Sequence, residues 1–221
     1  LPGVYFSSAG WADYNNDGEL DLSLTGINFS GTSITKFHLN QDQLLEQDLS
    51  QNVQAVFGGQ LSWVDYTNDG LLDLSLSGFQ IINFQGFPAT VFYKNQNGNF
   101  VFDSQNEVTY DIYGYTMGIN GGQNNHDWGD YDNDGDMDFV IGGVDYYGNI
   151  HLSVFTNDYG ILSKDVGQSS LSPLFPCMVK WVDVQNDGFL DLVTIGADSL
   201  GELGMRAVSY THLRAHETIP D

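Results

Sequence analysis

The chain has 221 residues, 41% of them hydrophobic and 14% aromatic, which is enough to bury a sizeable core and argues against disorder. Its 29 acidic residues far outnumber the six lysines and arginines, for a formal net charge of −23 at pH 7. Such a surface would repel nucleic acids and anionic membranes, so the sequence predicts neither as a partner. No stretch approaches the ~20 apolar residues that cross a bilayer, which predicts no membrane insertion.

The start of the chain and its single cysteine each lead to a prediction. The chain begins at Leu1 without an initiator Met or a charged-then-apolar leader, which is typical of a mature protein or an internal fragment. Cys177 is the only cysteine, so no disulfide can form within the chain, and we expect a buried, inert thiol.

A first motif, WADYNNDGELDLSLTG, occupies residues 11–26. The alternation of apolar and polar residues after its Asn-Asp-Gly turn predicts a strand with one buried face, and a short strand is expected before the turn. Residues 34–39 read as a further strand. Helical periodicity is absent from the chain, with a weak exception over residues 42–48.

The same motif returns three more times, as WVDYTNDGLLDLSLSG at 63–78, WGDYDNDGDMDFVIGG at 128–143 and WVDVQNDGFLDLVTIG at 181–196. The motifs begin at Trp11, Trp63, Trp128 and Trp181, 52, 65 and 53 residues apart. Further strands are predicted over 90–93, 100–102 and 150–155, with a hairpin turn at 95–99. Each unit thus has two strands joined by a Gly loop, followed by two further strands. This pattern predicts β-propeller blades, each a four-stranded antiparallel sheet. About four blades are expected, which would make an incomplete ring. The tryptophan of each motif is expected to pack within the fold.

Each motif places oxygen donors at fixed loop positions. Acidic or polar side chains stand at positions 1, 3, 5 and 9, Gly at position 6 allows a sharp turn, and position 7 can offer its backbone carbonyl. Asp, Asn and Gly also form ordinary turns, but four loops with the same pattern favour metal. The predicted ligands are Asp13, Asn15, Asp17, Glu19 and Asp21; Asp65, Thr67, Asp69, Leu71 and Asp73; Asp130, Asp132, Asp134, Asp136 and Asp138; and Asp183, Gln185, Asp187, Phe189 and Asp191.

The ligand types indicate Ca²⁺, about one per repeat and up to four in all. Calcium takes six to eight oxygens in irregular geometry, whereas magnesium demands a tighter octahedron and zinc prefers His or Cys, which these loops lack. The third loop carries four carboxylates and is predicted to bind tightest, and the second and fourth loops weakest. The loop matches an EF-hand loop over its first six positions, but its last acid is at position 9 and no helix flanks it.

These loops resemble the FG-GAP/VCBS repeat, the blade of integrin-α-type propellers. The resemblance covers about residues 1–207 and implies a calcium loop between the first two strands of each blade, in a ring of about seven blades. It also implies an extracellular or cell-surface location, as in the many bacterial proteins that use such repeats for adhesion or carry them beside catalytic domains.

The functional expectation is therefore a calcium-binding extracellular propeller module that serves adhesion or binds a protein or glycan ligand. The alternatives are the non-catalytic propeller part of a larger secreted enzyme, such as a carbohydrate-active hydrolase, and a structural spacer. The chain has no Gly-x-Ser-x-Gly or His-Glu-x-x-His motif, so we expect no enzyme activity and no catalytic residue. His126 is the best acid/base candidate but is interpreted as a loop histidine, and His38 and His151 as packing or surface residues. Candidates for an aromatic glycan-binding patch are Tyr110, Tyr113, Tyr115, Tyr146 and Tyr147.

The last residues depart from the repeat. The run VSYTHLRAHET at 208–218 resembles the translation of a sequencing adapter. We therefore expect residues 208–221 to be a non-native tail, and we do not interpret His212 and His216 as metal ligands.

Overall fold

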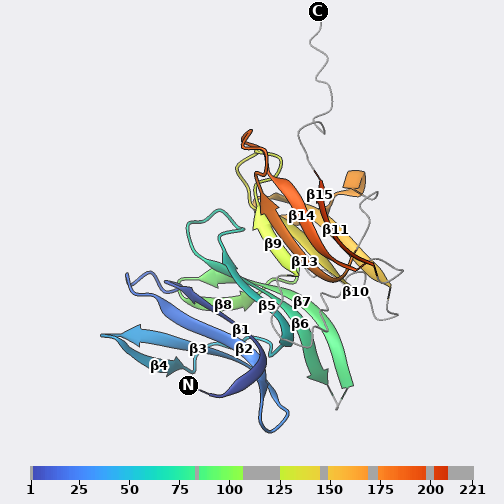
Figure 1. Cartoon of the computed structure of the whole chain (residues 1–221). Helices are drawn as coiled ribbons and strands as arrows, with labels where there is room; N and C mark the ends of the chain where they lie inside the picture. Colours follow the sequence, from blue (N-terminus) through green and yellow to red (C-terminus); the bar gives the residue numbers. More distant parts are fainter. Residues whose placement is uncertain are drawn as a thin grey trace, which may run out of the picture.

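The computed structural model is an all-β protein of four antiparallel sheets that follow one another in chain order (Figure 1). The structure describes residues 2–82, 85–106, 125–144, 149–168, 174–197 and 202–208. Three sheets have four strands, and the fourth has three within the described residues. The predicted all-β class, with one antiparallel sheet per motif, is confirmed.

Each sheet is a meander in which every strand pairs with the next along the chain. The first sheet contains β1 (Val4–Ala12), β2 (Asp21–Asn28), β3 (Ser33–Gln41) and β4 (Leu44–Asp48). The second contains β5 (Phe57–Val64), β6 (Asp73–Ile82), β7 (Gln85–Gln96) and β8 (Asn99–Phe102). The third contains β9 (His126–Gly129), β10 (Asp138–Val144), β11 (Ile150–Asp158) and β12 (Ile161–Lys164), and the fourth β13 (Phe175–Val182), β14 (Asp191–Ala197) and β15 (Leu203–Val208). A single 3₁₀ turn, η1 (Val166–Gln168), is described as well.

The weak helical periodicity over residues 42–48 does not correspond to a helix. Asp42 and Gln43 adopt φ values of 51° and 68° and form the turn of a hairpin. The turn lays β4 antiparallel to β3, with Leu45 opposite Asn40. Backbone pairing along β3 therefore decides the structure here, because it satisfies the peptide groups that a short isolated helix would leave unpaired.

The glycine that ends the motif lies, in the first two motifs, inside the second strand at a point where two strands approach closely. A Cβ atom on Gly78 would lie 2.7 Å from the carbonyl oxygen of Phe57, and one on Gly26 would lie 2.9 Å from Cβ of Ser7. The register of β1 and β5 shifts near these points, between Tyr5/Ser8 and Phe57/Gln60. The repeated glycine is thus explained by steric need at a β-bulge.

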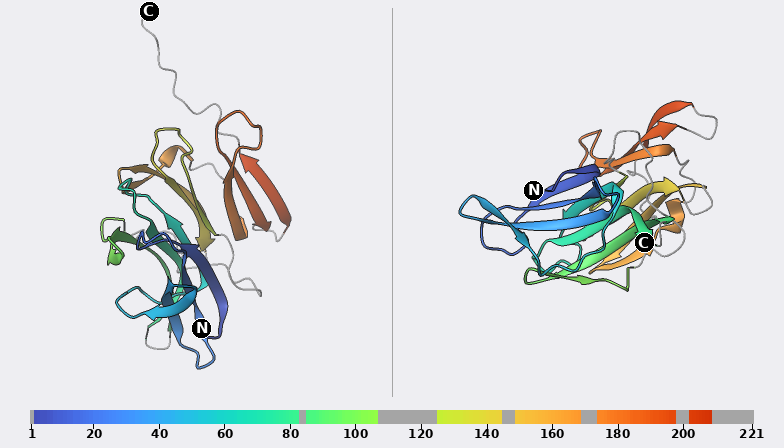
Figure 2. Two further views of the ribbon diagram at one scale, coloured as in Figure 1. Left: turned by 90° about the vertical axis from the view of Figure 1, so that its left-hand side faces the viewer. Right: turned by 90° about the horizontal axis from the view of Figure 1, so that it is seen from below.

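The sheets pack face to face in series. β1 contacts β5, β5 contacts β9 and β9 contacts β13, so the first strands of consecutive sheets are neighbours. Apolar side chains fill each interface, for example Phe37 of the first sheet against Leu74 and Leu76 of the second. The described sheets form an open arc with the first and fourth sheets at its ends (Figures 1 and 2).

Several expectations fall outside the described residues or at their margin. Backbone pairing places Val208 opposite Leu192 as the last residue of β15, so the strand extends one residue into the expected tail. Cys177 lies in β13, but its side chain is not described. Within the described part of the chain, no helix is long and apolar enough to cross a membrane. Residues 209–221 and Tyr110, Tyr113, Tyr115, Tyr146 and Tyr147 lie outside the described residues.

Candidate metal centre

All four motif loops share one backbone conformation between the first and second strands of their sheets. The asparagine at position 4 has φ between 56° and 60°, and the glycine at position 6 has φ between 86° and 99°. These values lie in the left-handed region, which Asn tolerates and Gly enters freely. The residues are Asn16 and Gly18, Asn68 and Gly70, Asn133 and Gly135, and Asn186 and Gly188.

The carboxylate at position 1 organises each loop. In the third loop, Asp130 accepts hydrogen bonds from the backbone N–H of Asp134 (3.0 Å) and of Gly135 (3.1 Å). The position-5 carboxylate of Asp134 in turn accepts the backbone N–H of Asp136 (2.9 Å). The same bonds recur in the other loops at 2.8–3.1 Å, with Asp13, Asp65 and Asp183 at position 1 and Asp17, Asp69 and Asp187 at position 5.

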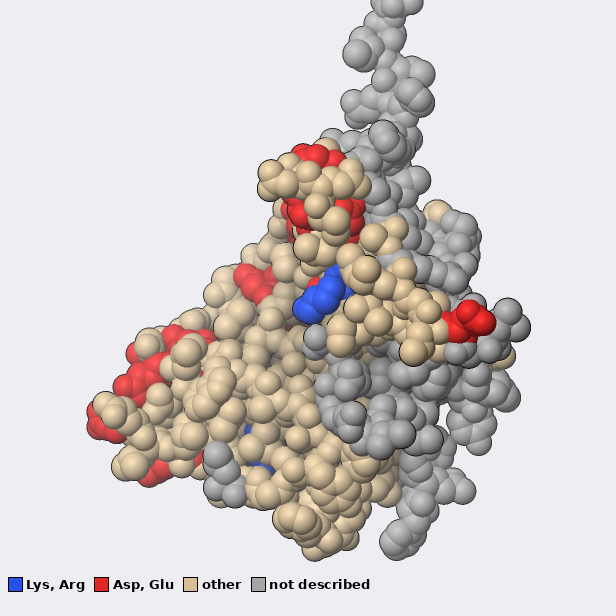
Figure 3. Space-filling view, viewed as in Figure 1, with Lys and Arg blue, Asp and Glu red and all other residues tan. Residues whose placement is uncertain are grey.

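The third loop brings its predicted ligands together. Oxygen atoms of Asp130, Asp132 and Asp138 all lie within 4.8 Å of one another. Asp134, the fourth predicted carboxylate, is not part of that group, although its charge acts on Asp138. Within the described residues, the other three loops do not bring three acidic groups into such a cluster. Their loop tips are nevertheless acidic, and acidic side chains gather at the ends of the sheets (Figure 3).

Neutral polar side chains take the third position in the other three loops, as Asn15, Thr67 and Gln185. Thr67 donates to Asp73 through both its hydroxyl (2.9 Å) and its backbone N–H (3.1 Å). Asn15 donates its amide to Asp17 (2.9 Å). Hydrogen bonds thus replace part of the acidic cluster where an aspartate is missing.

The side chain of Asp136, at position 7, is engaged outside its own loop. One of its oxygens accepts the backbone N–H of Tyr159 (2.7 Å), and the other accepts the side-chain amide of Asn68 in the preceding loop. This leaves the backbone carbonyl as the group of Asp136 that a cation could use. The carbonyls of Glu19, Leu71 and Phe189 at the same position remain predicted ligands.

The position-9 aspartates are buried at the start of each second strand. Asp21, Asp73 and Asp138 each accept one backbone N–H, at 2.7–2.9 Å, from an asparagine of the third strand. Oδ2 of Asp21 and Oδ1 of Asp191 are buried without a hydrogen-bond partner. A buried carboxylate oxygen without a partner is costly, so these atoms fit an oxygen-seeking cation.

The pKa values of the position-9 carboxyl groups reflect this burial. Burial raises the pKa of Asp21 and of Asp73 to about 6. Burial, together with repulsion by Asp132 and Asp134, raises the pKa of Asp138 to about 7. The charged forms are therefore destabilised without a positive partner, and a divalent cation would relieve that cost.

Comparisons with known proteins assign no family. No family model matches the chain, and no curated protein matches it either. Among solved structures, the chain is similar to a lectin from Agrocybe aegerita, described as recognising non-reducing terminal N-acetylglucosamine, at 16% identity and a TM-score of 0.38. The match covers 91% of this chain and 65% of the lectin, so the chain spans about two thirds of the lectin's length. A likeness this distant carries no functional argument.

The tyrosines at loop position 2 support the motif loops, and their role could not be recognised from the sequence pattern used above. Each stacks on the motif tryptophan of the next sheet, with ring centroids 5.1–5.8 Å apart and planes within 17° of parallel. The expectation that the tryptophans pack is confirmed for three of the four, whereas Trp11 is 56% exposed. Three of the four loops have a tyrosine at position 2, and this repetition in the sequence could have identified the residue. The pairs are Tyr14 with Trp63, Tyr66 with Trp128 and Tyr131 with Trp181.

Each of these tyrosines is also anchored within its own sheet. The hydroxyl of Tyr66 donates to Asp103 at 3.0 Å, just after the fourth strand, and Asn106 donates to the same carboxylate at 2.8 Å. Asn106 also donates to the carbonyl of Gly160 in the next sheet (2.6 Å). Tyr14 and Tyr131 make the matching bonds to Asp48 (2.9 Å) and Asp165 (2.8 Å).

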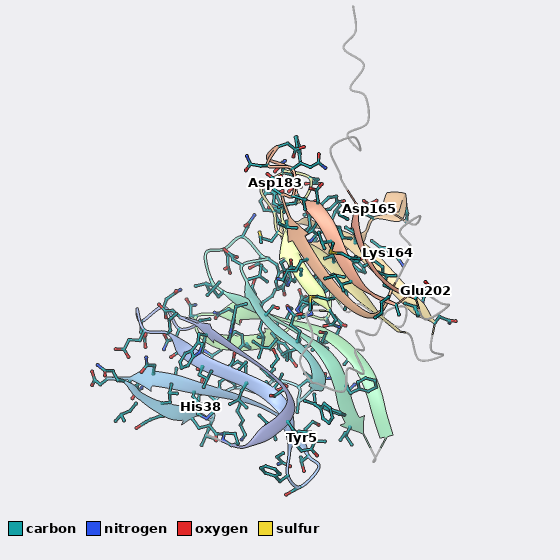
Figure 4. The ribbon with its side chains drawn as sticks, viewed as in Figure 1. Tyr5, His38, Lys164, Asp165, Asp183 and Glu202 are labelled. Atoms are coloured by element: carbon teal, nitrogen blue, oxygen red, sulfur yellow. The ribbon has the colours of Figure 1, made fainter. Side chains whose placement is uncertain are left out.

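His126, the acid/base candidate, begins β9 instead of lying in a loop, and it is fully buried between the second and third sheets. Its ring nitrogens lie 2.8–3.2 Å from the hydroxyl oxygens of Ser62, Ser75 and Ser77. Burial lowers its pKa to about 3. His38, on β3, is buried too. Asp183 lies in the fourth loop, directly after β13 (Figure 4). His126 therefore serves packing between the sheets.

Proposed function

We propose that the chain is a calcium-binding propeller module of a secreted or cell-surface protein, with one cation held in each motif loop. In this proposal the cations join the first two strands of every blade, and the module presents its surface to a protein or glycan ligand in adhesion. The cation would supply positive charge and oxygen coordination, and the loop residues supply the converging donors.

One observation carries the proposal: carboxylate oxygens of Asp130, Asp132 and Asp138 converge within 4.8 Å, and Asp138 is fully buried. Three anionic groups at this separation repel one another unless they share a proton or a cation. The position-9 carboxylate is rooted in a strand and the position-1 carboxylate in a rigid turn, so neither can swing away to relieve the repulsion. A structural turn needs no such convergence.

The donor set favours Ca²⁺ over other divalent ions. All the predicted ligands are oxygen atoms, and the set mixes carboxylates, side-chain carbonyls and backbone carbonyls, which suits the irregular coordination of calcium. Zinc would require His or Cys, and the four loops contain neither.

A non-catalytic role is part of the proposal. The one histidine considered as an acid or base, His126, is enclosed by three serines and has no exposed surface. General acid–base catalysis needs a group that reaches the substrate, and a fully buried side chain does not.

The two end faces suit further blades of the same kind. Trp11 presents an exposed indole at the position where Trp63 and Trp128 receive a tyrosine. At the other end, Val184 occupies loop position 2 and is 58% exposed, and Ile195 and Met205 are exposed on the same sheet. We include additional blades at both faces in the proposed assembly.

Thermal unfolding with and without Ca²⁺ tests the proposed function. Protein stripped with a chelator should melt at a clearly lower temperature than protein in millimolar Ca²⁺, because binding to the native state alone stabilises it. Asp132→Ala should remove part of the calcium-dependent gain, whereas replacing the exposed Asp158 of the same sheet, as Asp158→Ala, should leave it intact. Equal melting temperatures with Ca²⁺ and with chelator would overturn the proposal.

A further inference from the structure

Asn157 connects the second loop to the third. Its side-chain amide donates to the carbonyl of Tyr66, at position 2 of the second loop (2.8 Å), and to the carbonyl of Met137, at position 8 of the third (3.0 Å). Its backbone N–H donates to Oδ1 of Asp138, the buried candidate ligand (2.8 Å). One buried residue thus holds a carbonyl of one loop and a carboxylate of the next.

Asn95 repeats this arrangement one sheet earlier. Its amide donates to the carbonyls of Tyr14 (2.8 Å) and Leu72 (2.9 Å), and its backbone N–H donates to Oδ1 of Asp73 (2.7 Å). The side-chain oxygen of Asn95 accepts the N–H of Gly98 (2.7 Å), which fixes the orientation of the amide. The side-chain oxygen of Asn157 accepts the matching bond from Gly160 (2.9 Å).

Further side-chain contacts join neighbouring loops. The position-4 amide of Asn68 donates to the side chain of Asp136 and to the carbonyl of Gly135 (3.4 Å) in the following loop. Asn133 donates to the carbonyl of Gly188 in the fourth loop (3.4 Å). The tyrosine–tryptophan stacks tie each loop to the strand that leads into the next one. Neighbouring loops therefore cannot change conformation independently.

We propose that neighbouring loops bind cations with positive cooperativity, transmitted by Asn95 between the first and second loops and by Asn157 between the second and third. This inference rests on the proposed calcium sites. A cation that fixes the carboxylate of Asp138 also fixes the backbone N–H and amide of Asn157, and with them the Tyr66 carbonyl of the second loop. Part of the conformational entropy that the second loop loses on binding is then already lost before its own cation binds. By thermodynamic linkage, a cation in the second loop raises the affinity of the third loop by the same factor.

The test measures the Ca²⁺ affinity of one loop in a variant whose neighbouring loop binds Ca²⁺ weakly. The amide resonances of Gly18, Gly70 and Gly135 report on the first three loops, because each of these N–H groups donates to its own position-1 carboxylate. Asp134→Asn weakens the third loop while keeping a hydrogen-bond acceptor, and Asp17→Asn does the same for the first. The coupling factor is the Kd of the second loop for Ca²⁺ in the variant with a weakened neighbouring loop, divided by its Kd in the parent protein.

Replacing Asn95 and Asn157 in separate variants distinguishes coupling through these two residues, here called the relay, from a general loss of stability. We expect a coupling factor of about five-fold or more at each junction, the lower end of typical allosteric couplings. Asn157→Ala should lower the factor between the second and third loops and keep that between the first and second, and Asn95→Ala should do the reverse. Asn106→Ala is the matched control, since Asn106 also bridges the second and third sheets but bonds to Asp103 and to the turn between β11 and β12, outside the motif loops.

The outcomes distinguish this inference from the proposed function. Absence of Ca²⁺-dependent shifts at all three glycines overturns both. Saturable shifts whose Kd values are independent of the neighbouring loop overturn the relay and leave the calcium sites standing. Equal loss of coupling at both junctions in either asparagine variant, or loss in Asn106→Ala, also overturns the assignment of the relay to Asn95 and Asn157.

Discussion

The ring of Tyr131 lies parallel to the indole of Trp181, with centroids 5.1 Å apart and planes only 2° from parallel. Tyr131 belongs to the third motif loop and Trp181 to the strand that opens the next motif. The same stack recurs at Tyr66 and Trp128. Each of the first three loops is therefore part of the contact that joins its sheet to the next, so the ordering of the loop and the packing of the next sheet are coupled.

The stacks should contribute strongly to stability. Trp128→Ala should lower the free energy of unfolding by about 3 kcal/mol, because it removes the stack on Tyr66 and leaves a cavity between the sheets. It also removes the hydrogen bond from the indole to Ser75 (3.0 Å). Urea denaturation measures the difference. Trp11→Ala at the equivalent but exposed position is the control and should cost less than about 1 kcal/mol; equal costs at both positions would contradict the role of the stack.

The metal-free protein should become less stable as the pH rises from about 4 to about 7. A carboxyl group whose pKa is raised on folding contributes stability below its unfolded pKa of about 3.9, and that contribution is lost as the pH rises through the folded value. For Asp138 the folded pKa is about 7. Asp138→Asn should therefore flatten the pH dependence between about pH 4 and 7 by up to about 1.4 kcal/mol per pH unit.

The comparison is made by chemical denaturation in chelator, with parent and Asp138→Asn proteins side by side. Saturating Ca²⁺ should abolish the slope in the parent, because the cation binds the deprotonated carboxylate. A parent protein whose metal-free stability rises from pH 5 to pH 8 in the same way as that of the variant would show that Asp138 is not strained by its burial.

His126 should produce the opposite dependence in acid. Its pKa is lowered to about 3 by burial, so its stabilising contribution is complete above the unfolded value of about 6.5 and is lost as the pH falls. His126→Asn should be less stable than the parent at pH 7 but should lose less stability between pH 6.5 and pH 4. Denaturant titrations across that range measure both effects, and a parallel loss in the two proteins would refute the prediction.

The four loops should differ in affinity, with the third tightest and the second and fourth weakest. Position 3 is Asp132 in the third loop but Thr67 in the second and Gln185 in the fourth. Gln185→Asp should raise the affinity of the fourth loop roughly ten-fold, the order of effect of one added charge beside the cation. Gln185→Asn, the neutral control, should change it little. The readout is the Ca²⁺-dependent amide shift of Gly188, and equal affinities in the two variants would count against a charge-based ranking.

The sequence was informative wherever structure is local. The Asn-Asp-Gly turns, the strands that follow them and the convergence of Asp130, Asp132 and Asp138 could be predicted because they depend on residues within nine positions of one another. The stacking partners could not be predicted in this way, because Tyr66 meets Trp128 only when two sheets pack. Asn95 was missed for the same reason, since it reads as an ordinary hairpin residue until the loop of the preceding sheet is placed beside it.

Isothermal titration of the chelator-stripped protein with CaCl₂ tests the central claim most directly. We predict saturable uptake of several Ca²⁺ ions per chain, up to one per motif loop, with Asp138→Asn removing the tightest step. A flat titration, or uptake that Asp138→Asn leaves unchanged, would contradict the account.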